Sequence, residues 1–532
     1  MKLAHPLRPA GLGSLSFIVG GIIMKTEEKQ TNDRIRVLYI TPECTPFAHS
    51  GGLGEVAGSL PGALNRLRPN AKDGHSRFDC RVILPLYQQI PEKFRGQMKF
   101  LGYTQVAVTW RQQYAGLYEL HHEGVTYYFI DNEYYFHREN LYGYFDDGER
   151  FAFFSKAIFA VLPMLGFKPQ ILHANDWQTA LVPVWQTAFY HLPYITTVFT
   201  VHNIEYQGFY SLGFNDDVLG LPEEELHLVE FRGGINLMKG GIECANIFST
   251  VSPSYAEELK DPANAFGLDE IVRRNEQKLT GILNGINVKD YDPSHDPYIA
   301  VSYSAADPDG KADCKKDLQQ YLGLPERDVP VIAMISRLVS AKGVDILQQV
   351  LDHILEIRDV QFVLLGTGNP LYENWFRGLE TRHADRVRSL IMFNIPLSHQ
   401  IYAGSDILLV PSRSEPCGLT QMIGCRYASV PVVRATGGLR DSISDCSLGE
   451  GNGFVFEAYA PDGLQDAILR AIDRYSDHEN WKKLQVHDMR EDFSWNVSAK
   501  KYRDLYESIA LEAPAEAEPE AEAEPATEGA AE

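Results

Sequence analysis

At 532 residues the chain is too long for one ordinary domain, and its 44% hydrophobic and 23% charged residues are typical of a globular α/β protein rather than a membrane-embedded one. A formal net charge of −22 disfavours nucleic acid as a partner and means that an anionic substrate requires local positive charge. Seven cysteines, widely spaced and without a CxxC pair, exclude a disulfide framework and a structural zinc site, and predict reduced thiols in a cytoplasmic protein.

Both ends of the chain are predicted to lie outside the folded domains. Residues 512–532 contain almost only Ala, Glu and Pro, with eight Glu and no basic residue, which predicts a disordered acidic tail. Residues 1–33 include an apolar run at 15–24 that is too short to span a bilayer and has no cleavage motif after it. We interpret residues 1–33 as a disordered extension or an over-called start, in preference to an export signal, because Met24 would make a normal start.

A first series of strands and helices is predicted over residues 34–288. Apolar, β-branched runs predict buried strands, and longer periodic runs predict helices. The predicted strands lie at 34–40, 80–85, 126–130, 171–173, 196–200 and 246–251, and the predicted helices at 56–67 and 148–165.

The pattern restarts over residues 289–490. Its predicted strands lie at 329–335, 361–365, 406–410 and 431–434, and its clearest helix at 344–357. Strands that alternate with helices are typical of parallel sheets, so we predict an α/β protein with two doubly wound, Rossmann-like domains facing across a cleft. A capped amphipathic helix at 493–506 dominates the last predicted segment, 491–511.

The most informative stretch follows the predicted strand at 406–410. Glu415 leaves the carboxyl end of a sheet, where ligands of open α/β folds bind, and a helix is predicted from near Leu419. The glycine pair Gly437 and Gly438 follows the next strand and lets backbone N–H groups approach an anion closely. A carboxylate for hydroxyl groups beside amides for phosphates is the combination that a sugar nucleotide requires.

The run 415–421, Glu-Pro-Cys-Gly-Leu-Thr-Gln, resembles a motif of bacterial glycogen synthases and plant starch synthases. Five further motifs of that family occur in the family's order, at 51–56, 173–178, 200–208, 281–285 and 336–343. The resemblance covers about 34–510 and implies the GT-B glycosyltransferase architecture, with the C-terminal helix returning to the first domain. It implies a retaining glucosyltransferase that extends glycogen or a maltooligosaccharide from ADP-glucose or UDP-glucose. No cofactor is implied, and no metal, because the sequence has no Asp-x-Asp in a cleft setting.

The resemblance also implies which residues form the site. Arg337 and Lys342, five residues apart, are expected to bind the two donor phosphates and stabilise the departing group. Asp176, His202 and Glu415 complete the expected catalytic set, the first two near the glucosyl hydroxyls and the anomeric carbon. The expected substrate-binding residues are Glu43, His49, Gly51, Gly52, Asn284, Cys417, Gly418, Thr436, Gly437 and Gly438. Cys417 is expected to contribute its backbone N–H and its packing, not a nucleophile.

Three positions depart from the family pattern. His49 stands where the family has lysine, which removes a permanent cation from the donor site; Glu55 and Asn287 each stand where the family has aspartate. Two alternatives remain open: a glucan phosphorylase-like enzyme, for which the sequence offers no pyridoxal-lysine motif, and a glucan-binding protein that has lost catalysis. His49 and Asn287 favour the second alternative, whereas Arg337, Lys342 and Glu415 together oppose it. The oligomeric state is not indicated.

Overall fold

We describe the chain from a computed structural model, which describes residues 34–68, 76–447 and 449–510. The predictions for 1–33 and 512–532 lie outside these residues. None of the helices in the described ranges has the length and apolar character that crossing a membrane requires.

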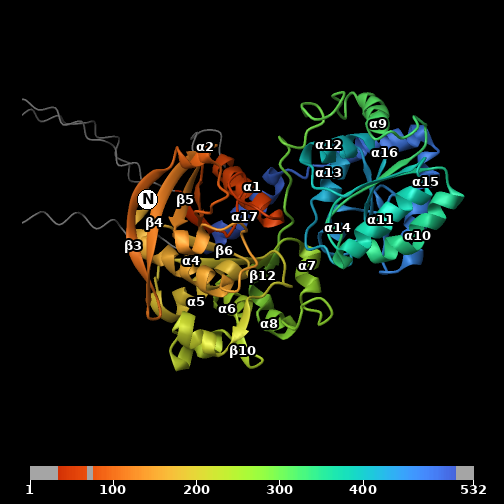
Figure 1. The fold of residues 1–532 in the computed structure, drawn as a ribbon. Coiled ribbons are helices and arrows are strands. Elements are labelled where there is room, and N and C mark those ends of the chain that lie inside the picture. The colour runs from red at the N-terminus through yellow and green to blue at the C-terminus, as the bar shows by residue number, and fades with distance from the viewer. Residues whose placement is uncertain (1–33, 69–75, 448, 511–532) are drawn as a thin grey trace, which may run out of the picture. The chain divides into compact units, whose positions relative to one another are not determined.

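The first domain is built on a nine-stranded sheet (Figure 1). In spatial order its strands are β12 (Leu279–Gly281), β11 (Ile247–Thr250), β7 (Thr196–Val201), β6 (Ile171–Asn175), β1 (Ile35–Ile40), β2 (Phe78–Pro85), β5 (Val125–Asp131), β4 (Arg111–His122) and β3 (Lys99–Val108). The strands from β12 to β5 pair in parallel, and every strand predicted for this domain is present.

The far edge of this sheet differs from the prediction of purely parallel sheets. Strands β4 and β3 pair antiparallel with their neighbours. Only Thr109 and Trp110 separate the two strands, and a connection of two residues can form a hairpin but not the long crossover that a parallel pair needs. The sequence interpretation missed both strands because many of their side chains face solvent, so no buried apolar run marks them.

Helices surround the first sheet. The helices that precede residue 282 are α1 (Gly52–Arg66), α2 (Glu92–Arg95), α3 (Glu133–Phe136), α4 (Asp147–Val161), α5 (Leu181–Trp185), α6 (Leu237–Cys244), α7 (Pro253–Glu258) and α8 (Asp269–Arg274). A small three-stranded sheet also lies in this domain, in the order β8 (Phe209–Ser211), β10 (Gly234–Asn236) and β9 (Glu230–Phe231).

The second domain contains a six-stranded parallel sheet. In spatial order its strands are β15 (Val387–Leu390), β14 (Gln361–Leu365), β13 (Val331–Ile335), β16 (Ile407–Val410), β17 (Val430–Arg434) and β18 (Phe454–Phe456). Its helices are α9 (Gly310–Tyr321), α10 (Val344–Ile357), α11 (Pro370–Arg382), α12 (Ile395–Gly404), α13 (Thr420–Arg426), α14 (Gly437–Ser442), α15 (Pro461–Tyr475) and α16 (His478–Arg490). The prediction of two doubly wound α/β domains is confirmed.

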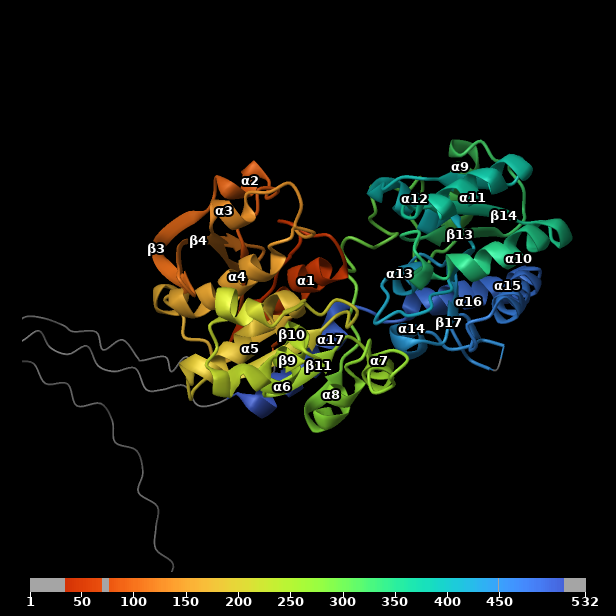
Figure 2. The ribbon, with the colours of Figure 1, turned by 60° about the horizontal axis from the view of Figure 1, so that its bottom comes forward.

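Helices cover both faces of the second sheet (Figure 2). Along β13 the side chains alternate: Ile332 and Met334 pack in one core with α10, α11 and α15, whereas Val331 and Ala333 pack in the other with α9 and α12. Because both faces are buried, the ligand-accessible part of such a sheet is the edge where the strands end.

The last helix, α17 (Trp495–Ile509), belongs to the first domain in space. It lies, in blue, among the red and orange elements of that domain (Figure 1). The Tyr506 hydroxyl lies 2.6 Å from His173 Nδ1, and Ser498 Oγ donates to the Leu283 carbonyl at 2.6 Å. The two segments that pass between the domains pair through Ile286 N–H, which donates to the Phe493 carbonyl at 2.8 Å.

Candidate active site

Four loops meet at the carboxyl edge of the second sheet, after β13, β14, β16 and β17. Backbone hydrogen bonds join them: Leu338 N–H donates to Thr367 at 2.8 Å, and Arg413 N–H donates to Ala341 at 2.9 Å. Parallel strands end at one edge, so residues far apart in the sequence are brought together there. The loops carry Arg337, Lys342 and Glu415.

The structure brings Lys342 and Glu415 into direct contact. Lys342 Nζ lies 2.5 Å from Glu415 Oε2, and Ser412 Oγ donates to the same oxygen at 2.9 Å. The Glu415 side chain is 10% exposed and that of Lys342 24%, so the pair lies at the boundary of the protein interior. A carboxylate that can accept hydrogen bonds from sugar hydroxyl groups therefore adjoins an ammonium that can bind phosphate. Sugar and phosphate are both parts of a sugar nucleotide.

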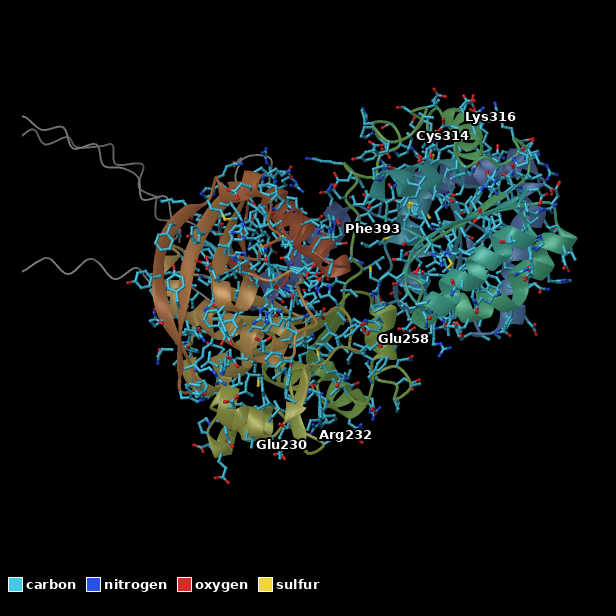
Figure 3. All side chains as sticks on the ribbon, viewed as in Figure 1. Glu230, Arg232, Glu258, Cys314, Lys316 and Phe393 are labelled. Carbon is cyan, nitrogen blue, oxygen red and sulfur yellow. The ribbon has the colours of Figure 1, made fainter. Side chains whose placement is uncertain are left out.

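Arg337 is a cation at this edge that forms no ion pair among the described residues. It is exposed, and its guanidinium makes no hydrogen bond or ion pair within the described chain. A second exposed group here escaped the sequence interpretation: Phe393, which follows β15 and is 84% exposed (Figure 3). An aromatic ring left in water at a ligand-binding edge offers a stacking surface, and the signal that could have identified it is its place just after a strand end.

The backbone amides predicted to bind phosphate are already occupied. Gly437 N–H donates to Glu258 Oε1 at 2.7 Å, and Gly438 N–H donates to the Glu415 carbonyl at 3.1 Å. Thr436 Oγ1 also donates to Glu258, at 3.0 Å. Gly437 does bind an anion through its backbone N–H, and that anion is a carboxylate of the protein itself. Glu258 was not singled out from the sequence, where it is one acid in a helix of the first domain.

Cys417 and Gly418 lie between β16 and α13. Burial raises the pKa of the Cys417 thiol to about 12, so the thiol remains protonated and does not serve as a nucleophile. Gly418 adopts a φ of +72°, which turns the chain into α13. That helix begins at Thr420, one residue from the predicted position.

In the first domain, Glu43 supports the glycine-rich loop from below. Its Oε2 accepts hydrogen bonds from Ser50 N–H at 2.8 Å and Ser50 Oγ at 2.7 Å, and its Oε1 accepts one from Gly54 N–H at 3.0 Å. Glu43 is 3% exposed. These hydrogen bonds link the Glu43 carboxylate to the loop that carries Gly51 and Gly52.

His49 lies on the exposed side of the same loop. With Ser50 and Tyr142 it lines a pocket of about 360 Å³, whose other walls include Gln89 and Glu139. The charge of His49 acts on Glu55, whose pKa is raised by burial and partly restored by the histidine. The His49 side chain thus lines this pocket at the position where the family has lysine.

Asp176 and His202 follow the neighbouring strands β6 and β7. Asp176 Oδ1 accepts a hydrogen bond from His202 N–H at 2.7 Å, and Asp176 adopts a φ of +56°, which is strained for a residue other than glycine. Burial, with a contribution from the charge of Glu43, raises the pKa of Asp176 to about 7. Burial lowers the pKa of His202 to about 3, so its ring is neutral; His202 Nε2 lies 3.0 Å from Asn175 Oδ1.

Asn284 lies in the segment that leaves the first domain. It is 4% exposed, and among the described residues its Oδ1 has no hydrogen-bond partner. A buried acceptor without a donor is unfavourable by about 1–3 kcal/mol, so this oxygen is suited to accept a hydrogen bond from a ligand hydroxyl group. Within the described ranges, no three His, Cys, Asp or Glu side chains form a group that could hold a metal ion.

Comparison with protein families identifies both domains. Residues 36–274 match the family model described as "Starch synthase catalytic domain", and residues 318–485 match the model described as "Glycosyl transferases group 1".

Individual proteins match over nearly their whole length. The chain is 45% identical to a glycogen synthase of Desulforamulus reducens over 484 residues, which are 89% of this chain and 99% of that protein. It is 42% identical to the glycogen synthase of Bacillus subtilis, covering 89% of this chain and 98% of that one. Among solved structures, the catalytic domain of starch synthase IV from Arabidopsis thaliana, bound to ADP and acarbose, superposes with a TM-score of 0.81 at 34% identity, covering 90% of this chain and 99% of that one.

Proposed function

The chain belongs to the family of bacterial glycogen synthases and plant starch synthases, which are glucosyltransferases of GT-B architecture, and from this premise we propose that it transfers glucose from ADP-glucose to the non-reducing end of an α-1,4-glucan with retention of configuration. The observation that carries the proposal is the contact between Lys342 and Glu415 at the carboxyl edge of the second sheet. The contact supports the proposal because an ammonium that can bind phosphate lies beside a carboxylate that can accept hydrogen bonds from sugar hydroxyl groups.

The second domain holds the donor in this proposal. Arg337 and Lys342 bind the diphosphate, because a guanidinium and an ammonium supply charge-assisted hydrogen bonds to phosphate oxygens. Glu415 accepts hydrogen bonds from the glucosyl hydroxyl groups, and the exposed ring of Phe393 stacks on the base. Adenine is favoured because the starch synthase IV structure holds ADP, and UDP-glucose is the alternative donor.

The occupied amides of α14 change one part of the donor site. Since Gly437 and Gly438 already donate to Glu258 and Glu415, they support the site rather than contact the donor phosphates. The diphosphate therefore depends more strongly on Arg337 and Lys342 than the sequence alone suggested.

In the transition state, negative charge develops on the departing phosphate and positive charge develops on the anomeric carbon, and both must be stabilised. The bond between the anomeric carbon and the phosphate oxygen breaks as a glucan hydroxyl oxygen attacks from the same face, and the departing phosphate accepts the hydroxyl proton. Arg337 and Lys342 stabilise the departing phosphate, and Asp176 as a carboxylate stabilises the positive charge at the anomeric carbon. The rival mechanism forms a covalent glycosyl–enzyme intermediate, which needs a carboxylate oxygen that bonds to the anomeric carbon. In the proposed mechanism Asp176 forms no such bond and acts only through its charge.

The proposal is tested by elongation of a maltooligosaccharide primer by the full chain. We expect glucosyl transfer from ADP-glucose with a higher kcat/KM than from UDP-glucose, and no loss of activity in the presence of a chelator. The two alternatives predict other results: a phosphorylase-like enzyme releases glucose 1-phosphate from glucan and inorganic phosphate, and a glucan-binding protein shows no turnover with either donor. Loss of activity on chelation that magnesium restores would show that the donor diphosphate is held by a metal.

His49 provides a second test, at the position where the family has lysine. We expect His49→Lys to lower the KM for ADP-glucose about two- to fivefold, because a permanent cation beside the donor strengthens binding to a diphosphate. The KM for the primer should not change. Steady-state kinetics with the donor varied at saturating primer measure the effect, and an unchanged donor KM means that His49 does not face the donor.

A further inference from the structure

Two short helices from different domains each bind a carboxylate of the other. Glu258, the last residue of α7, accepts hydrogen bonds from Gly437 N–H at 2.7 Å and Thr436 Oγ1 at 3.0 Å, where α14 begins. In return, Asp441 of α14 accepts hydrogen bonds from Ser254 N–H at 2.8 Å and Ser254 Oγ at 2.7 Å, where α7 begins. We call this set of five residues the carboxylate exchange; Glu258 is labelled in Figure 3.

The exchange has a defined electrostatic basis. Each carboxylate lies at the amino-terminal end of the opposite helix, where unpaired N–H groups carry partial positive charge. Hydrogen bonds to a charged acceptor are about twice as strong as neutral ones. The contact therefore has a preferred geometry, unlike an apolar contact of similar size.

The start of α14 is in turn built onto the loop that carries Glu415. Gly438 N–H donates to the Glu415 carbonyl at 3.1 Å. A Cβ atom at Gly437 would lie 2.1 Å from the Glu415 carbonyl oxygen, and one at Gly438 would lie 2.0 Å from that of Cys417. Because these approaches exclude any side chain, α14 and the loop 415–417 form one close-packed unit.

A third contact from the first domain reaches the same loop. Ser252, the N-cap of α7, donates from its Oγ to the Pro416 carbonyl at 2.5 Å. The segment 252–258 thus contacts the loop 415–417 directly at Pro416 and indirectly through α14. Neither contact involves a side chain that we assign to substrate.

We propose that Glu258 is a positioning residue for the donor: through the carboxylate exchange it fixes the loop that carries Glu415 and Cys417 in the geometry that binds the glucosyl group. The inference rests on the proposed function and deepens it, because it makes a residue of the first domain responsible for a donor contact in the second. It also gives Thr436 and Gly437 a role, which is to bind Glu258 rather than the donor.

The first experiment compares Glu258→Gln with a matched control, Glu257→Gln. The Gln side chain keeps the size of Glu258 but removes the negative charge that accepts the hydrogen bonds from Gly437 N–H and Thr436 Oγ1. The neighbouring Glu257 is 73% exposed, and within the described ranges its carboxylate pairs with Lys260 alone, so its replacement alters the same helix by the same chemistry without changing a contact to α14. We expect Glu258→Gln to raise the KM for ADP-glucose about tenfold while the primer KM stays within twofold. Glu257→Gln should match the wild type in both.

Three kinetic results overturn the inference. An unchanged donor KM shows that the exchange does not act on the donor loop. An equal rise in both KM values shows a general effect on the contact between the domains. A lower donor KM shows that Glu258 competes with the donor for the amides of α14. If Glu258→Gln fails to fold, Asp441→Asn, which breaks the other half of the exchange, takes its place in the same assays.

A second readout separates this inference from the proposed function. Hydrogen–deuterium exchange of the full chain should be faster at residues 412–420 in Glu258→Gln than in Glu257→Gln, with or without activity. If the wild type transfers no glucose but this difference is present, the proposed function fails and the positioning role of Glu258 stands. If the wild type is active and the hydrogen–deuterium exchange rates of the two variants agree at residues 412–420, the positioning role of Glu258 fails.

Discussion

Replacement of Arg337 by alanine is expected to lower kcat/KM for ADP-glucose roughly 10²–10³-fold, and replacement of Lys342 is expected to do the same. In the proposed mechanism both cations stabilise charge that develops on the departing phosphate, and the N–H groups of Gly437 and Gly438, which could have shared this task, donate to Glu258 and Glu415. Lys316→Ala is the matched control, because Lys316 is an exposed lysine of the same domain whose single ion pair among the described residues is with Asp313. Steady-state kinetics at saturating primer measure all three variants.

The two replacements should differ in stability, and this difference separates a catalytic loss from a folding defect. Arg337 is exposed and makes no side-chain interaction within the described ranges, so Arg337→Ala should leave Tm unchanged. Lys342→Ala leaves the carboxylate of Glu415, which is 10% exposed, without its ion-pair partner, and should lower Tm measurably. An Arg337→Ala protein that folds and turns over near the wild-type rate would show that the diphosphate is held elsewhere.

The second large effect is expected at Asp176. Because kcat/KM reports the ionisation of the free enzyme, and burial raises the pKa of Asp176 to about 7, kcat/KM should fall as the pH is lowered from 8 to 6. In the proposed mechanism, protonation removes the negative charge that stabilises the anomeric centre. The neighbouring histidines do not produce this dependence, since burial holds the pKa of both His173 and His202 near 3. Asp176→Asn should reduce kcat/KM at pH 8 by about 10²-fold and abolish the dependence.

Asp176 also makes a prediction about stability with a definite sign. Its pKa in the folded chain lies above the usual aspartate value of 3.8, so between about pH 4 and 7 the folded state binds the proton more tightly than the unfolded state does. The contribution of this group to stability therefore decreases as the pH rises through that window. Asp176→Asn, which keeps an oxygen to accept the hydrogen bond from His202 N–H, should raise Tm relative to wild type at pH 8 and not at pH 4. A kcat/KM profile that still falls below pH 7 in this variant would assign the dependence to another group.

Much of the fold could be predicted because local periodicity encodes it. Helix α10 was predicted with the bounds that it has, 344–357, since its apolar residues recur at helical spacing and pack on one face of the sheet. Strand β14 was likewise predicted at 361–365 from an uninterrupted apolar run. Strand β15 contains Arg388 and Ser389 between its two apolar residues, and β18 has only three residues, so neither shows such a run.

Within the site, the sequence by itself determined which side chains lie at the carboxyl edges of the strands, because strand order and motif position decide that. The partners of those side chains were decided only by the tertiary structure. Glu43, predicted to bind substrate, accepts hydrogen bonds from Ser50 and Gly54, and the N–H of Gly437, predicted to approach a phosphate, donates to Glu258.

The physical reason is that a buried or partly buried carboxylate requires hydrogen-bond donors, and any donor within reach satisfies it. Glu258 and Gly437 are 179 residues apart, and no local sequence pattern indicates that the end of α7 lies beside the beginning of α14. The sequence determined the types of group at the site and the loops that carry them. The tertiary structure decided which of these groups remain free for a ligand, with Arg337 exposed and unpaired, Lys342 shared with Glu415, and the amides of α14 bound to the protein itself.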